Sequence, residues 1–276
     1  MKPFWTLVRK NLHDARWPLF LSSSLLAFLG WLLVYVASRN ETRIRQSLAE
    51  GKAGNWIRQM GLEADPPSVE IMMTFWANPP FIMLLVSMFA LGRGANAVGA
   101  EIERGTLDMV MSRPVSRSAY LGAQVLATIL GLLAITGSLA IGTYAATFYN
   151  VLKSPPTFGL LLEPAFNLAA LAFPMYGYTL LFSSMDIVRW RPLTAGSSLT
   201  LAGFISRVIS MIPVFKDSWW RPWAEHASVF SLYNPVDAVS GRGHSGQDVA
   251  ILLGAGAAFI VLAFLAFAHR DLPANA

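Results

Sequence analysis

The sequence contains no cysteine, which excludes disulfide frameworks, thiolate metal sites and cysteine nucleophiles. Charged residues are scarce as well, because they make up 13% of the chain, whereas about 25% is typical of a soluble domain. Hydrophobic residues, in contrast, make up 54% of the chain. This composition indicates a membrane protein.

Sequence patterns of hydrolytic and nucleotide-binding sites are also missing. No Gly-x-x-x-x-Gly-Lys-Ser/Thr phosphate loop occurs, and Gly51-Lys52 is followed by Ala53. The sequence has no Gly-x-Ser-x-Gly elbow and no His-Glu-x-x-His pair, which disfavours a membrane-embedded hydrolase. The four histidines are scattered over loops and tails without helical pairing. We therefore expect no catalytic residue, no metal site and no cofactor bound by this chain.

Six apolar stretches are long enough to cross about 30 Å of hydrocarbon as helices. The first is longer than the core of a signal peptide, and no clear cleavage pattern follows it, so we interpret it as a retained span. The sequence thus predicts an all-α polytopic protein, with residues 1–276 forming a single transmembrane domain. The predicted spans are residues 19–37, 80–97, 120–147, 165–185, 193–213 and 249–268.

The distribution of cations predicts the orientation of these six spans. The amino-terminal segment, the second and fourth loops and the carboxyl tail, with Arg93 at the end of the second span counted among them, hold eleven Lys and Arg against six acids. The other three loops hold nine against ten, although they are longer. Because cytoplasmic loops carry an excess of Lys and Arg, both termini are expected in the cytoplasm.

Residues 1–17 have the pattern of an amphipathic helix. Phe4, Trp5, Val8 and Leu12 recur at helical spacing on one side, with charged residues on the others. Such a helix fits the inner membrane interface, where cations meet anionic lipid. Two interpretations stay open, namely a membrane anchor that orients the first span and a contact for a cytoplasmic partner.

The second loop, residues 101–118, predicts a stop, a two-turn helix and a restart. Gly105 breaks the preceding helix, Thr106 can cap the short one, and Pro114 prevents a simple continuation. Ser116 or Ser118 can cap the third span. One interpretation is an ordinary capped loop, and the other is a helix that fills a groove in a soluble partner. In the second case the apolar face would be Leu107, Val110 and Met111, and the charged rim would be Glu101, Glu103, Asp108, Arg113 and Arg117.

The same loop resembles a pattern found in permease subunits of ABC-2 type exporters. That pattern is an acidic residue, Gly-Thr-Leu, a few residues, and then Ser-x-Pro-Val-Ser-Arg. The residues that match it here are Glu101, Glu103, Gly105, Thr106, Leu107, Ser112, Pro114, Val115, Ser116 and Arg117.

The resemblance implies a fold of the ABC-2, or type V, exporter kind, in which this loop is a coupling helix docked on a separate ATPase subunit. It implies two ATPase copies that hold ATP and Mg²⁺, and two copies of this chain in the inner membrane of a bacterium. The run Ser231–Val239, with Asn234 and Pro235, is similar to the branch that matures a copper enzyme, nitrous oxide reductase. No nucleic acid partner is expected.

The fifth loop, residues 214–248, is a candidate for a segment that dips back into the outer leaflet. Trp219, Trp220 and nearby charges suit the outer interface, either as anchors or as a gate at the exit. Arg207 lies inside the fifth predicted span and either snorkels outward or lines a path. Candidate path or gate residues are therefore Arg207, Trp219, Trp220, Asn234 and Pro235.

Three functions are compatible with these patterns. The first is an ATP-driven exporter subunit, and the second is a non-transporting module that transmits ATP-driven motion to an extracytoplasmic partner protein, with the first loop as one contact. The third is a membrane-embedded enzyme, which the missing catalytic patterns disfavour. A polar cavity at the interface of two copies would favour transport over transmission.

Overall fold

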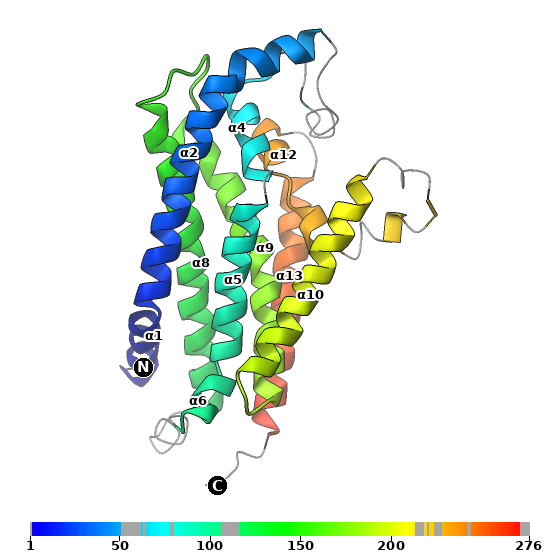
Figure 1. Ribbon diagram of the computed structural model, residues 1–276. Helices are drawn as coiled ribbons and strands as arrows, with labels where there is room; N and C mark the ends of the chain where they lie inside the picture. The colour runs from blue at the N-terminus through cyan, green and yellow to red at the C-terminus, as the bar shows by residue number, and fades with distance from the viewer. Residues whose placement is uncertain are drawn as a thin grey trace.

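The computed structural model is an elongated helical bundle in which the first and last helices end on the same side (Figure 1). It describes residues 2–50, 62, 65–77, 80–105, 116–212, 218–219, 221–223, 228–241 and 244–270. Every regular element in these ranges is a helix, which confirms the predicted all-α class.

Four helices are long and apolar enough to cross a membrane by themselves. Two shorter helices, α4 (Ser68–Ala77) and α5 (Phe81–Asn96), meet at a bend of 53° and together pass as a fifth span. Helices long and apolar enough for a membrane span thus lie at four of the six predicted places, and at a fifth if the bent pair forms one span. The four long helices are α2 (Arg16–Ala49), α8 (Arg117–Thr147), α9 (Phe158–Met185) and α13 (Ser245–Ala268).

The sixth predicted place is occupied by α10 (Trp190–Met211), which is less apolar. Its 22 residues would cover about 33 Å at 1.5 Å per residue, so its length suits a crossing. Arg191, Arg207 and several Ser and Thr residues lower its hydropathy, and α10 is not among the spans found by length and composition. A sixth crossing stays a prediction.

The helix α9 is the centre of the bundle, since it contacts α5, α8, α10 and α13 (Figure 1). Leu168, Met175 and Tyr176 on α9 are each fully buried. A helix that is apolar on all sides is expected in such a position. Pro164 and Pro174 lie inside α9 without ending it.

The predicted amphipathic segment forms α1 (Lys2–Asp14), which packs on α8. Val8 is buried against Ala123 and Ala127, whereas Trp5 is 57% exposed. The apolar side chains of α1 are therefore divided between the bundle and the surroundings. Its place in a membrane interface stays a prediction.

At the end of the bundle opposite α1, α2 extends beyond the length of a span. Its 34 residues correspond to about 51 Å, against about 30 Å of hydrocarbon. There Glu41, which is 6% exposed, accepts hydrogen bonds from Arg45 Nη2 at 2.7 Å and Ser68 Oγ at 2.6 Å. The backbone N–H of Lys153 also points to this carboxylate at 3.4 Å. This cluster joins α2, the start of α4 and the loop after α8.

The helix α12 (Pro235–Ser240) lies near the same end (Figure 1), and the short helix η2 (Val229–Leu232) precedes it in the chain and contacts α10 and α13. Pro235 occupies the first turn of α12, where its missing N–H is harmless, and the helix ends at Gly241 with a φ of 64°. The helix α12 packs on α4 and α9, so this part of the fifth loop belongs to the bundle.

Candidate functional site

The predicted contact segment 101–118 begins on α6 (Gly99–Glu103), a short helix at the same end of the bundle as α1 (Figure 1). The helix ends at Glu103, and Gly105 has a φ of 67°, in the left-handed region that favours glycine. The predicted break at Gly105 is confirmed. Other predicted contact residues lie outside the described part of the chain, namely Thr106, Leu107, Asp108, Val110, Met111, Arg113 and Pro114.

The start of this segment is held by α9. The Ser183 hydroxyl is fully buried and accepts hydrogen bonds from the N–H groups of Gly99 at 2.9 Å and Val98 at 3.3 Å. The same hydroxyl donates to the carbonyl of Ala95 at 3.1 Å. These bonds satisfy backbone groups at the turn between α5 and α6, and they fix that turn to the end of α9.

A second contact fixes the far end of α6. The Glu103 carboxylate accepts a hydrogen bond at 3.1 Å from the backbone N–H of Arg189, which directly precedes α10. On the other side of the same helix, Lys10 Nζ lies 3.8 Å from a carboxylate oxygen of Glu101. The helix α6 is thus tied to α1, α9 and the start of α10.

The end of the segment is fixed as well. The Ser116 hydroxyl accepts a hydrogen bond from the N–H of Ala119 at 3.1 Å, so Ser116, one of the two predicted candidates, is the N-cap of α8. One turn further on, the Tyr120 hydroxyl donates to the carbonyl of Ala97 at 2.6 Å. The helices that flank residues 106–115, α6 and α8, are therefore both tied to other parts of the bundle.

Arg117 was expected at the charged rim of the contact surface, and the structure shows a contact inside the bundle. Its Nη1 donates to the carbonyls of Phe267 and Ala268, both at 3.2 Å, and of Arg270 at 2.6 Å. The first two carbonyls belong to the C-terminal end of α13 and the third lies just beyond it, a place where a cation is favourable. Arg117 therefore joins α8 to α13, and a contact with a separate ATPase subunit stays a prediction for this residue.

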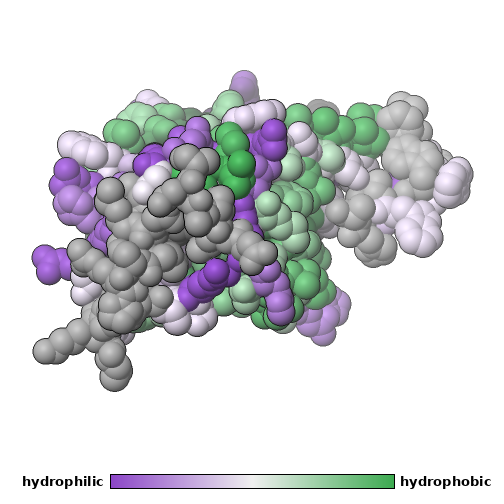
Figure 2. All heavy atoms as spheres, turned by 90° about the horizontal axis from the view of Figure 1, so that it is seen from below, coloured by the Kyte–Doolittle hydropathy of each residue, from purple (hydrophilic) through white to green (hydrophobic). Residues whose placement is uncertain are grey.

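The turn between α9 and α10 is closed in a similar way. Arg270 Nη1 donates to the carbonyls of Ser184 at 2.8 Å and Asp186 at 3.0 Å, while the Asp186 carboxylate accepts from the N–H of Ile187 at 2.7 Å. Polar residues at the ends of apolar runs were the only sequence signal for these contacts. Figure 2 looks onto this end of the bundle, where hydrophilic side chains gather beside green apolar flanks.

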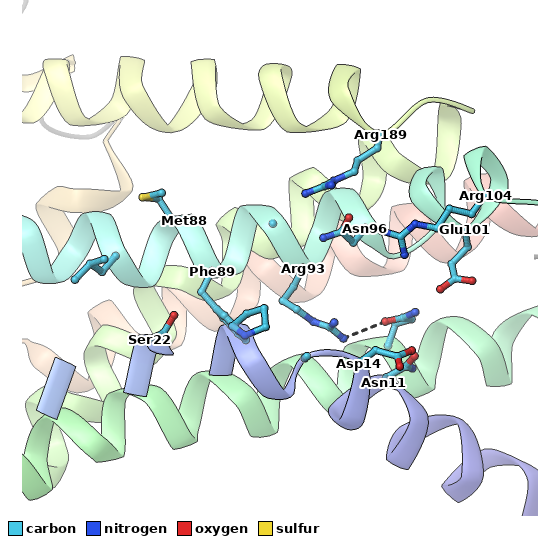
Figure 3. Close-up of a pocket in the computed structure, with 15 residues that line it drawn as sticks. Asn11, Asp14, Ser22, Met88, Phe89, Arg93, Asn96, Glu101, Arg104 and Arg189 are labelled. Atoms are coloured by element: carbon cyan, nitrogen blue, oxygen red, sulfur yellow. Dashed lines mark hydrogen bonds between the residues drawn. The ribbon is translucent and has the colours of Figure 1, made fainter. Parts of the chain in front are cut away.

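A cavity of about 510 Å³ lies between α1, the start of α2, and α5 (Figure 3). It was not predicted from the sequence, because its lining comes from distant parts of the chain. Arg93 extends from α5 in Figure 3, and a dashed line marks the hydrogen bond that its Nη2 donates. The acceptor is Gln124 Oε1 on α8, at 3.2 Å. The lining residues are Asn11, Asp14, Ala15, Pro18, Ser22, Leu85, Met88, Phe89, Gly92, Arg93, Asn96, Glu101, Arg104, Gln124 and Arg189.

The described path and gate residues lie on different elements. Arg207 is half-buried on α10, and Trp219 is 83% exposed. Asn234 precedes α12, and its Nδ2 donates to Asp237 Oδ2 at 2.6 Å, while Pro235 is buried. Trp220 lies outside the described residues. The structure thus gives Asn234 and Pro235 a role in starting α12.

A metal centre has no candidate ligands in the described ranges. Groups of three or more His, Asp or Glu side chains close enough to hold an ion do not occur among the residues described.

These features define the class of a multi-pass helical membrane protein. Residues 5–272 match the family described as ABC-2 family transporter protein, and the chain belongs to this family. Its members are non-catalytic membrane subunits that generally dimerise and pair with an ABC ATPase. A comparison with curated proteins gives no match.

Proposed function

We propose that this chain is the permease subunit of an ATP-driven ABC exporter and that residues 101–118 dock on a separate ATPase subunit. The observation that carries this proposal is the attachment of both ends of the segment. Ser183 holds its start through Gly99, and Ser116 and Tyr120 hold its end. A displacement of the docked segment would therefore move α5 and α8, instead of being absorbed by a loose loop.

Two copies of the chain would form the translocation path, and two ATPase subunits would hold ATP and Mg²⁺. The helix α10 supports this arrangement, because Thr194 and Ser198 are exposed on it although it lies among apolar helices. Polar groups in a membrane favour a partner helix or a water-filled path over lipid. The proposed location is the cytoplasmic membrane of a bacterium, with both termini inside.

A second function is transmission of ATP-driven motion to an extracytoplasmic partner without transport. The Glu41 cluster favours it, because α2 extends beyond its span and is rigidly joined to α4 and the loop at Lys153. The run around Asn234 is similar to the copper-enzyme maturation branch, which would fit such a partner. It packs near the same end of the bundle.

The proposed orientation has a direct test. A reporter that is active only in the cytoplasm is expected to work when fused after Ala276 or within residues 112–118, because the surrounding loops carry the excess of cations. The same reporter should be inactive when inserted at Gly54. Activity of the reporter at Gly54 would contradict the proposed orientation.

The proposed division of labour also has a test. The purified chain is expected to show no ATP turnover, since the sequence holds no phosphate-binding loop. Turnover should appear when the ATPase subunit is co-expressed and co-purified. Hydrolysis by the isolated chain, at a rate that survives further purification, would refute the proposal.

A further inference from the structure

The cavity beside α1 changes from apolar to charged along the axis of the bundle. Along α5, Leu85, Met88 and Phe89 line one end, and Arg93 and Asn96 line the other. These positions span about 16 Å at 1.5 Å per residue. The charged end points toward α6, at the end of the bundle where α1 lies (Figures 1 and 3). A phospholipid has the same sequence of properties, with a charged headgroup followed by acyl chains.

Cations at the charged end exceed the acids. Arg93, Arg104 and Arg189 line the cavity together with Asp14 and Glu101, and Lys10 lies 3.8 Å from Glu101. In Figure 3 the Arg189 side chain extends from the start of α10 toward Asn96 on α5. Within the described residues, no ion pair of 4.0 Å or less joins any of the three arginines to a carboxylate. Their charge is available to an anion.

A buried polar group without a partner points to the same ligand. Asn11 on α1 is 5% exposed and lines the cavity, and its Nδ2 has no hydrogen-bond partner among the described residues. The Asn96 Oδ1, on the opposite wall, also has none in this part of the chain. A buried amide donor is normally satisfied, so an acceptor from outside the chain fits Asn11. A phosphate ester supplies such acceptors, and a glycerol hydroxyl supplies a donor for Asn96.

The surroundings of the cavity are those of a membrane surface. Met88, which lines it, is 68% exposed, and Trp17 on the neighbouring α2 is 62% exposed. Large apolar side chains exposed in this way favour lipid as the medium around the opening. The volume of about 510 Å³ is sufficient for a headgroup and the first part of the acyl chains.

We propose that this cavity binds an anionic phospholipid. Arg93 and Arg189 face the phosphate, Asn11 donates to one of its oxygens, and the upper acyl chains lie against Leu85 and Met88. The inference requires the membrane location of the chain but not its coupling to an ATPase. Its failure would therefore leave the proposed function untouched.

Filling the cavity gives the first test. A Cβ at Gly92, which lines the cavity, meets no atom within 4 Å, so we expect Gly92→Leu to place its side chain in the cavity. Gly137→Leu on α8 is the matched control, since its Cβ also meets nothing within 4 Å and Gly137 does not line the cavity.

The probe is phosphatidylglycerol with a fluorophore on one acyl chain, titrated into the full chain in detergent. We expect binding to weaken roughly tenfold in Gly92→Leu and to stay unchanged in Gly137→Leu. Equal affinity in both variants would overturn the proposal.

The charge requirement gives the second test. Arg189 is exposed, so Arg189→Gln should fold normally, and Arg191→Gln is the control because Arg191 is exposed two residues away and outside the lining. Phosphatidylglycerol is expected to bind Arg189→Gln more weakly than the wild-type chain, and to bind Arg191→Gln with wild-type affinity. Phosphatidylcholine is expected to bind the wild-type chain more weakly than phosphatidylglycerol does, because its ammonium group would lie near the arginines. Soluble glycerol phosphate at the lipid concentration should displace nothing. Displacement of the lipid by glycerol phosphate would contradict the proposal, because the ligand would then be a soluble phosphate. Equal affinity of phosphatidylglycerol for both arginine variants would overturn the role of Arg189.

Discussion

Gly142→Val is expected to destabilise the bundle by about 3 kcal/mol, because it forces apart two helices whose backbones touch. A Cβ at Gly142 on α8 would lie 2.0 Å from the carbonyl oxygen of Ala27 on α2 and 2.6 Å from its Cα. Those atoms belong to the backbone and cannot rotate away. Gly30 on α2 makes the corresponding close approach to α8, since a Cβ at Gly30 would lie 2.7 Å from the carbonyl oxygen of Leu139. In membranes, such small residues let helices approach closely and stabilise their association.

The measurement is the thermal unfolding midpoint of the full chain in detergent. The control is Gly137→Val on the same helix, where a Cβ meets no atom within 4 Å. Both variants carry the same helix-propensity change, so the difference between them isolates the contact between α2 and α8. Equal midpoints for the two variants would mean that the close approach contributes nothing to stability.

The comparison of these two glycines shows what the sequence could predict. Small residues in apolar runs predict close helix packing as a class, and Gly131, Gly137, Gly142, Gly196, Gly203, Gly254 and Ala258 share that property. A Cβ added at Gly142 or Gly196 would lie 2.4 Å or less from a neighbouring atom, whereas one added at Gly137 or Gly254 would meet nothing within 4 Å. The sequence does not say which face of a span meets which neighbour, and that information decides the outcome.

The spans and their ends were more accessible to sequence reasoning. Apolar length located the helices. Local chemistry located the break at Gly105 and narrowed the cap of α8 to Ser116 or Ser118, because both features depend on neighbouring residues only. The prediction of a membrane span has least support at α10, because the length of this helix fits a span and its polar residues do not.

The candidate site was harder to predict, because its contacts join distant parts of the chain. Arg117 looks like a rim charge in its own loop, but it caps α13, which lies about 150 residues further along. Similarly, the cavity takes Asn11 from α1 and Arg189 from the start of α10, and only the packing of the bundle brings them together. Tertiary contacts of this kind have no local signal.

The second large effect is expected in the contact segment itself. If Leu107, Val110 and Met111 are buried in a groove of the ATPase subunit, Val110→Ala with Met111→Ala should weaken the complex by about 2 kcal/mol or more. The weakening should be seen at any salt concentration, since it removes apolar contacts. Neither residue lies in a predicted membrane span, so insertion and dimerisation of the chain should be unchanged.

A charged residue at the rim should behave differently. Arg113→Ala is expected to weaken the complex mainly at low ionic strength, because rim charges chiefly alter association rate and salt dependence. Arg113 is a better choice than Arg117, whose contacts with the end of α13 would add a structural effect.

The direct measurement is recovery of the co-expressed ATPase subunit on the affinity-tagged chain, at low and at high salt, together with ATP turnover of the purified complex. The account predicts loss of the ATPase at both salt concentrations for the Val110→Ala, Met111→Ala variant and loss mainly at low salt for Arg113→Ala. Full recovery and unchanged turnover in the double variant would show that residues 106–117 are only a capped loop, and would contradict the proposed coupling.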